Sequence, residues 1–101
     1  MAEAAAPIVV QVDPDLKELI PEFLRRRHDD VAALRNAIAL ADWASIRRLG
    51  HRLRGTGGGY GFDAITDLGH HLEDAARAED APAVRKWTDD LASHLDRVVV
   101  V

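Results

Sequence analysis

Every glycine of this chain lies in one short stretch. All seven occur between residues 50 and 69, and the other eighty-one residues contain none. A glycine inside a helix costs about 1 kcal/mol relative to alanine, whereas a glycine cluster that follows a helix usually forms a loop. The stretch is therefore a loop, a place where the fold or a partner requires the absence of side chains, or both.

The length and composition describe one small soluble domain. The chain has 101 residues, of which 48% are hydrophobic and 30% are charged. A chain of this size buries only about 60 to 65% of its unfolded surface, so its core must come from a few well-packed elements. Because the chain has no cysteine, a disulfide scaffold and a thiolate metal site are both excluded.

Hydrophobic residues recur at helical spacing along most of the chain. Asp13 is a plausible N-cap for a short helix over 14–20, which Pro21 breaks or kinks. The apolar stripes then predict four longer helices joined by short connections, over 22–41, from Asp42 to the glycine stretch, over 63–78 and over 82–98. We therefore expect an all-α fold, an antiparallel up-down four-helix bundle with a short extra N-terminal helix, as one domain over 14–101.

The two ends of the chain are less regular. Residues 1–13 begin Ala-rich and continue into a short β-like stretch around Ile8 to Val12. Because no second strand is evident, we interpret 1–13 as an N-terminal tail that packs loosely or frays. The closing run Val98 to Val101 is either the last helical turn or a frayed tail, and the sequence leaves both open.

Charge and hydropathy narrow the expected partners. The apolar runs are far shorter than the roughly 20 residues that a membrane span needs, and the start lacks the basic region of a signal peptide, so we expect a cytoplasmic monomer that does not contact a membrane. The net charge of −4 argues against general nucleic-acid affinity. We expect no metal site, because the adjacent His70 and His71 diverge by about 100° on a helix and cannot chelate one ion together.

One histidine stands out on the helix that precedes the glycines. On the helical wheel His51 lies roughly 160° from both Leu49 and Leu53, which belong to the inner stripe, so it should face solvent. Arg47 and Arg48 one turn before, Arg54 and Gly55 one turn after, and Gly58 two turns on share its outward face. An exposed imidazole is a competent nitrogen nucleophile, and guanidinium groups can neutralise a phosphoryl group that it accepts.

These residues resemble a known family. The run from His51 to Phe62, HRLRGTGGGYGF, is similar to the signature of histidine-containing phosphotransfer domains, in which Lys-Gly follows the phospho-accepting histidine at three and four positions and Gly follows it at ten. The resemblance extends over roughly 14–98 and includes the segment 20–24, the helix start at Asp42 and the pair Leu72-Glu73. Arg54 replaces the usual lysine, which keeps the charge but presents a planar fork.

The resemblance implies a function and a set of partners. It implies that His51, through its outer ring nitrogen, accepts a phosphoryl group from the aspartate of a response-regulator receiver domain and passes it to another. The chain would then be a stoichiometric phosphocarrier of a two-component phosphorelay, working with receiver domains and a hybrid sensor histidine kinase. It is not expected to be an enzyme, because it has no ATP-binding signature. It would need no cofactor of its own, because Mg²⁺ is expected on the receiver.

The other site residues receive supporting roles in this interpretation. Arg54 would stabilise the transferring group, with Arg47 or Arg48 in support. Gly55 and Gly58 would let the receiver approach closely, and Gly61 would make the turn into the next helix. Tyr60 and Phe62 are candidates for the rim of the docking surface, although packing at the turn also explains them.

Two alternatives and several residues outside the site remain. A module that binds receivers without transfer, and sequesters or competes for them, is the alternative function, although it would have no need of a nucleophile. A metal-binding bundle enzyme would require inward Glu-x-x-His motifs, which the inner stripes lack. The run Arg25 to Arg27 is interpreted as the solvated side of its helix, and His28 and His94 as boundary packing residues.

Overall fold

The computed structural model describes residues 6–101, so residues 1–5 of the predicted tail lie outside the described part of the chain. Four α-helices make up most of it, and each predicted helix bound lies within two residues of the observed one. The elements, in chain order, are the strand β1 (Ile8–Val10), the 3₁₀ helix η1 (Pro14–Leu19), α1 (Ile20–Ala39), α2 (Trp43–Thr56), the 3₁₀ helix η2 (Gly58–Tyr60), α3 (Asp63–Arg77), α4 (Ala81–Arg97) and the strand β2 (Val98–Val100).

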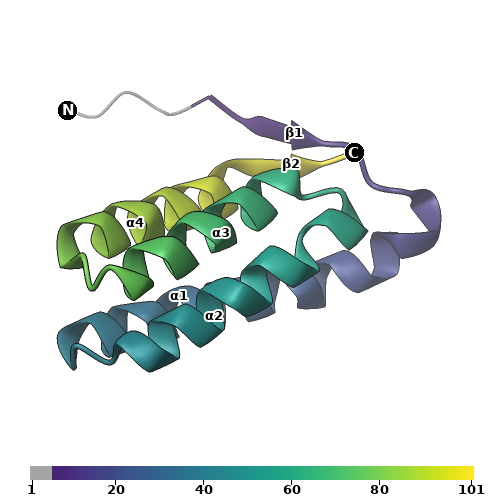
Figure 1. Cartoon of the computed structure of the whole chain (residues 1–101). Coiled ribbons are helices and arrows are strands. Elements are labelled where there is room, and N and C mark those ends of the chain that lie inside the picture. Colours follow the sequence, from purple (N-terminus) through teal and green to yellow (C-terminus); the bar gives the residue numbers. More distant parts are fainter. Residues whose placement is uncertain (1–5) are drawn as a thin grey trace.

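Consecutive helices run in opposite directions and pack into a bundle (Figure 1). The prediction of a four-helix bundle is confirmed. Two tight turns of the same design reverse the chain: Ala41 and Glu79 adopt positive φ angles of 51° and 52°, and the aspartate that follows each of them caps the next helix. Asp42 accepts a hydrogen bond from the backbone N–H of Ser45, and Asp80 accepts one from that of Ala83.

The core lies between the four helices. Its fully buried side chains come from every helix and from the segment that precedes α3, as the predicted inner stripes require; they are Leu34, Ile46, Leu53, Phe62, Ile65, Leu72, Val84, Thr88 and Leu91. Leu19, at the end of η1, does not join this core and is 51% exposed, although it lies on one helical face with Leu16 and Ile20 in the sequence. Pro21 does not break a helix; it occupies the first turn of α1, where its missing N–H is not needed.

The two ends of the chain pair with each other, which the sequence analysis did not anticipate. β1 and β2 form a two-stranded parallel sheet with Val9 opposite Val99, and the two strands lie side by side in Figure 1. The pairing continues through the backbone, because the Val12 N–H donates to the Val101 carbonyl at 3.1 Å. Val10 and Val12 are buried. The expectation that this segment packs loosely without a partner strand is therefore wrong for the described residues.

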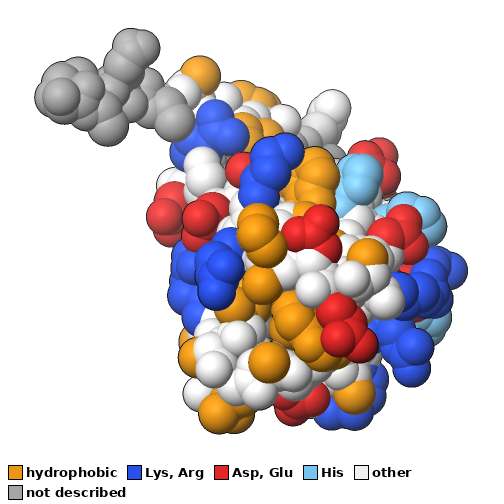
Figure 2. Space-filling model, turned by 60° about the vertical axis from the view of Figure 1, so that its left-hand side comes forward, with side chains coloured by type: hydrophobic (Ala, Val, Ile, Leu, Met, Phe, Trp, Pro, Cys, Tyr) orange, Lys and Arg blue, Asp and Glu red, His pale blue; other side chains and the backbone are white. Residues whose placement is uncertain are grey.

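Charged side chains of both signs cover the surface. On the face that carries the α1–α2 and α3–α4 turns, acidic and basic residues are interspersed with hydrophobic ones (Figure 2). This face therefore carries no single-signed field, which agrees with the small net charge of −4. Among the described residues no helix is both long and apolar enough to cross a membrane.

Candidate functional site

His51 lies near the middle of α2 and faces outward, as its place on the helical wheel predicts. Its side chain is 67% exposed. One ring nitrogen, Nδ1, lies 3.2 Å from Oε2 of Glu73 on α3. A carboxylate can only accept hydrogen bonds, so in the neutral imidazole this contact assigns the proton to Nδ1 and leaves Nε2 as the unprotonated nitrogen.

Glu73 is the buried centre of this arrangement. Its side chain is only 5% exposed, yet it has three donors: Oε2 accepts from His51 and from Arg77 at 3.0 Å, and Oε1 accepts from Arg54 at 2.9 Å. Burial by itself would raise the pKa of Glu73, but Arg77, His51 and Arg54 together hold that pKa below its ordinary value. The carboxylate is therefore ionised at neutral pH beside the imidazole.

Two glycines bring α2 and α3 close enough for this contact. A Cβ atom on Gly50 would lie 2.8 Å from the backbone nitrogen of Glu73 and 2.9 Å from the carbonyl oxygen of Gly69. A Cβ atom on Gly69 would collide with the backbone of α2 at Leu53 and Arg54. Helix backbones can approach this closely only where side chains are absent, so part of the glycine stretch is explained by the placement of Glu73 against His51.

The three arginines predicted around His51 differ in the groups that they contact. Arg54 is 42% exposed and is paired with Glu73. Arg48 donates to Ser45 Oγ at 3.1 Å. Arg47 and Arg48 line a shallow hollow together with Ala44, His51 and Glu73. Arg47, Arg48 and the imidazole thus border one surface depression, whereas Arg54 is held by the carboxylate of Glu73.

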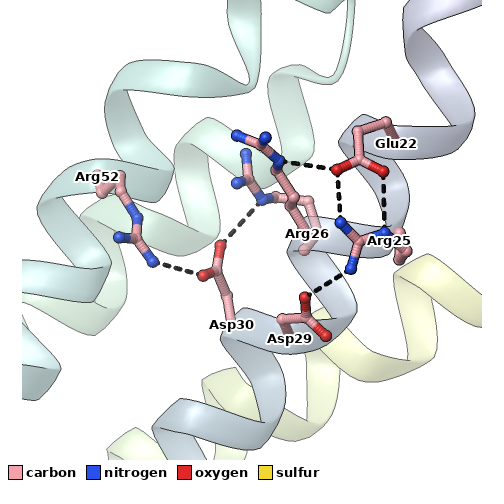
Figure 3. Close-up of polar contacts among 7 residues, drawn as sticks. Glu22, Arg25, Arg26, Asp29, Asp30 and Arg52 are labelled. Atoms are coloured by element: carbon pink, nitrogen blue, oxygen red, sulfur yellow. Dashed lines mark hydrogen bonds and ion pairs between the residues drawn. The ribbon is translucent and has the colours of Figure 1, made fainter.

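The opposite side of α2 carries a second ion-pair network. Asp30 of α1 is 5% exposed and binds Arg52 at 2.6 Å, which reaches across from α2 (Figure 3). Asp30 also pairs with Arg27 at 2.9 Å, and Arg27 in turn donates to Thr56 Oγ1 at 3.0 Å. The interpretation of Arg27 as a solvated residue is therefore wrong, because its side chain is 8% exposed and bridges α1 to the end of α2.

The predicted docking glycines follow His51 along the chain. Gly55, one turn later on α2, is exposed, and a Cβ atom placed there would meet nothing within 4 Å. Gly58 is exposed in η2. Gly61 has φ 85°, which favours glycine, and it ends η2 before α3; the predicted turn is confirmed. A clearance role for Gly55 and Gly58 stays a prediction.

The two aromatic residues of the stretch differ in exposure. Phe62 is 1% exposed, and its ring lies 5.2 Å from that of Phe23. Its assignment to the rim of a docking surface is therefore wrong, because it belongs to the core. Tyr60 is half-buried, and its ring centroid lies 4.5 Å from that of Phe23. Only Tyr60 retains a surface that a partner could contact.

Sequence reasoning missed Glu73 and Arg77 as site residues. In the sequence, Glu73 was assigned only to the family-like pair Leu72-Glu73. A signal was present, because Glu73 follows Gly69 by four residues and therefore shares its face of α3. An acidic residue on the same helical face as a glycine indicates a polar group at a close helix contact. Arg77, four residues further on, would then have followed as its counter-ion.

The remaining histidines are separate from this site. His70 is exposed near Asp74, and His71 stacks on Trp87 at 4.3 Å. His94, expected at a boundary, is 6% exposed, and its burial together with Arg97 lowers its pKa. Within residues 6–101, no three His, Asp or Glu side chains are arranged to hold a metal ion.

Comparison with known proteins supplies one finding. The model of the Hpt domain family matches residues 18–99, which include all four helices and the His51–Glu73 pair. No curated protein and no solved structure gave a match. Hpt domains are phosphotransfer carriers rather than kinases, and they interact with receiver domains and kinases in phosphorelays. With most of its length matched, this chain belongs to the Hpt domain family.

Proposed function

We propose that this chain carries a phosphoryl group on Nε2 of His51 between aspartates of response-regulator receiver domains. The observation that supports this most directly is the state of the imidazole. Its Nδ1 contacts a buried carboxylate, while the side chain is 67% exposed. A nucleophile needs a lone pair directed at its target, and Nε2 has one.

The proposed transfer step needs only the phosphorylated receiver and the His51 imidazole as reactants. Nε2 attacks the phosphorus of the receiver's phosphoaspartate, the Nε2–P bond forms, and the P–O bond breaks with the aspartate leaving as a carboxylate. Nδ1 keeps its proton, so the ring becomes cationic as the bond forms. The Glu73 carboxylate at 3.2 Å stabilises this developing charge, which is the kind of preorganised electrostatic contact that lowers a barrier.

The arginines supply the complementary charge. Arg47 and Arg48 border the hollow beside His51, where they can neutralise the phosphoryl oxygens. Arg54 keeps donors beyond the one that binds Glu73, since a guanidinium has five N–H groups. The receiver provides the phosphoaspartate and Mg²⁺, so this chain needs little beyond the nucleophile, its carboxylate partner and these cations.

The test is phosphate transfer from labelled receiver domains. Each receiver of the source organism, phosphorylated in the presence of Mg²⁺, is mixed with the wild-type chain, with His51→Gln and with His70→Gln, which removes an exposed histidine elsewhere. We expect acid-labile, base-stable label on the wild type and on His70→Gln, and none on His51→Gln. Label that persists on His51→Gln would refute the assignment. Binding of receivers without label on any variant would instead favour the non-transferring module.

A further inference from the structure

The Glu73 carboxylate has one donor that the proposed function does not use. Arg77, one turn further along α3, places an amino group 3.0 Å from Oε2, the same oxygen that His51 Nδ1 contacts. Its side chain is 54% exposed, and its other amino group lies 3.3 Å from the exposed Asp74. Arg77 thus joins the buried carboxylate of Glu73 to the exposed carboxylate of Asp74.

Arg77 is a second arginine beside the buried charge of Glu73, and it would remain there if Arg54 moved away. Glu73 is one buried negative charge, and the charged or titratable side chains that contact it are His51 and Arg54 from α2 and Arg77 from α3. If Arg54 turned towards an incoming phosphoryl group while His51 was still neutral, it would leave Oε1. A buried carboxylate without a counter-ion carries a large desolvation penalty, so this movement would be opposed unless another cation stayed in place.

We propose that Arg77 is a positioning residue that holds the Glu73 carboxylate ionised and directed at His51, so that Arg54 is free to exchange from Glu73 to the phosphoryl group. The inference rests on the proposed function of His51. Arg77 itself touches neither the phosphoryl group nor Nε2. It acts through Glu73 and sets how readily Arg54 becomes available.

Arg54 and Arg77 bind different oxygens of the Glu73 carboxylate. Arg54 follows His51 by three residues on the same helix and binds the oxygen that His51 does not use. Arg77 binds the oxygen that His51 does use, from α3. Before transfer, while His51 is neutral, removal of Arg77 would leave Arg54 as the one remaining cation among the side chains that contact Glu73, and would hold it there. The expected defect of an Arg77 variant is therefore a loss of phosphate stabilisation by Arg54, a residue on another helix.

Potassium phosphoramidate is the probe, because it phosphorylates imidazole without any partner protein. Nε2 of His51 attacks phosphorus, the Nε2–P bond forms, and the P–N bond breaks with nitrogen leaving as ammonia. The rate of phosphohistidine formation is measured for the wild type, Arg77→Gln, Arg77→Lys and Asp74→Asn. The last variant is the matched control, because it neutralises the exposed partner of Arg77 and leaves the contact between Arg77 and Glu73 in place.

We expect Arg77→Gln to slow phosphorylation by about tenfold, as for a lost charge-assisted hydrogen bond, and Arg77→Lys to restore most of the rate. Asp74→Asn should match the wild type. Carbon NMR of the Glu73 side chain should show a higher pKa for this carboxyl in Arg77→Gln, a readout that a merely structural role would leave unchanged. Equal rates in Arg77→Gln and the wild type would overturn the proposal, as would an unmoved Glu73 titration.

A double-mutant cycle tests whether the effect passes through Arg54. In an Arg54→Gln background, Arg77→Gln should have little further effect on the rate, because the residue that it releases is already absent. Additive effects would overturn the exchange. Failure of the proposed function is distinguished independently: a wild-type chain that gains no phosphate on His51 refutes the carrier role, while the Glu73 titration still decides whether Arg77 controls the carboxylate.

Discussion

The two sides of α2 hold their neighbours by different means. Towards α1, long side chains bridge the gap: the buried Asp30 binds Arg27 and Arg52. Towards α3, the backbones themselves approach across Gly50 and Gly69, and the buried carboxylate there, Glu73, binds two arginines and an imidazole.

This difference explains why Glu73, and not Asp30, is suited to assist a reaction at His51. Asp30 has only guanidinium partners, so its charge is used to join two helices. Glu73 gives one contact to a histidine whose other nitrogen is exposed, and the close glycine contact fixes that geometry at the level of the backbone. A bridge of long side chains can adjust its length by changing rotamers, whereas a backbone contact cannot. The His51 imidazole is therefore oriented from the more rigid of the two sides of α2.

The largest effect should come from Asp30→Asn. This change leaves Arg27, with a side chain only 8% exposed, without its counter-ion, and breaking a buried pair in this way costs about 3 kcal/mol. We expect the free energy of unfolding in urea to fall by that amount. Phosphorylation of His51 by phosphoramidate should be unchanged at temperatures where the variant is folded. A rate loss that matches that of Glu73→Gln would show that the two sides of α2 are not functionally distinct.

Gly69→Ala should have the next largest effect on the free energy of unfolding, and it tests the backbone contact between α2 and α3. The added methyl group meets the backbone of α2 at Leu53 and Arg54, which can respond only by moving the helix, at about 2 kcal/mol. Separation of α2 from α3 should also weaken the His51–Glu73 contact, visible as a changed tautomer signal of His51 in nitrogen NMR. Gly59→Ala is the matched control, since a Cβ atom at Gly59 meets nothing within 4 Å. Equal losses in both variants would contradict a special role for the contact.

Glu73→Gln should cost less in stability and more in function than Asp30→Asn. Hydrogen bonds to a charged group are exchanged for weaker ones to an amide, at about 1 kcal/mol at neutral pH, while phosphorylation should slow by about tenfold or more because the cationic ring loses its carboxylate.

The same variant should be less sensitive to acid. The folded-state pKa of Glu73 lies below its ordinary value of 4.5, so its stabilising contribution is complete above pH 4.5 and is lost as the pH falls through the folded-state pKa. The stability difference between wild type and Glu73→Gln should therefore shrink below pH 4.5 in urea titrations. A difference that does not vary with pH would show that Glu73 is not ionised through its arginine and histidine contacts.

The sequence predicted the bundle because each helix carries its own signal, a periodic apolar stripe with an aspartate cap such as Asp42. It predicted the exposure of His51 for the same reason. What it missed depends on two segments at once. The β1–β2 pair joins residues 90 positions apart, and the burial of Arg27 depends on Asp30 and on Thr56 of another helix. Glu73 was overlooked because its importance arises only when Gly50 and Gly69 meet across two helices.

The smallest effect on stability should come from substitution of Gly55, on the exposed side of α2. Gly55→Ala should raise the free energy of unfolding, whereas Gly69→Ala should lower it. Nothing lies within 4 Å of a Cβ atom at Gly55, so Gly55→Ala should raise the free energy of unfolding by about 0.5 kcal/mol through helix propensity alone. The role proposed for Gly55 is clearance for a partner. Gly55→Leu should leave phosphorylation by phosphoramidate and the circular dichroism spectrum unchanged, because a small donor needs no clearance. Transfer from a phosphorylated receiver should slow, because the new side chain stands one turn from His51, where the receiver must approach. If Gly55→Leu accepts phosphate from receivers as fast as the wild type, clearance is not the reason for this glycine, and the close approach of helices would account for the glycine stretch only at its buried positions.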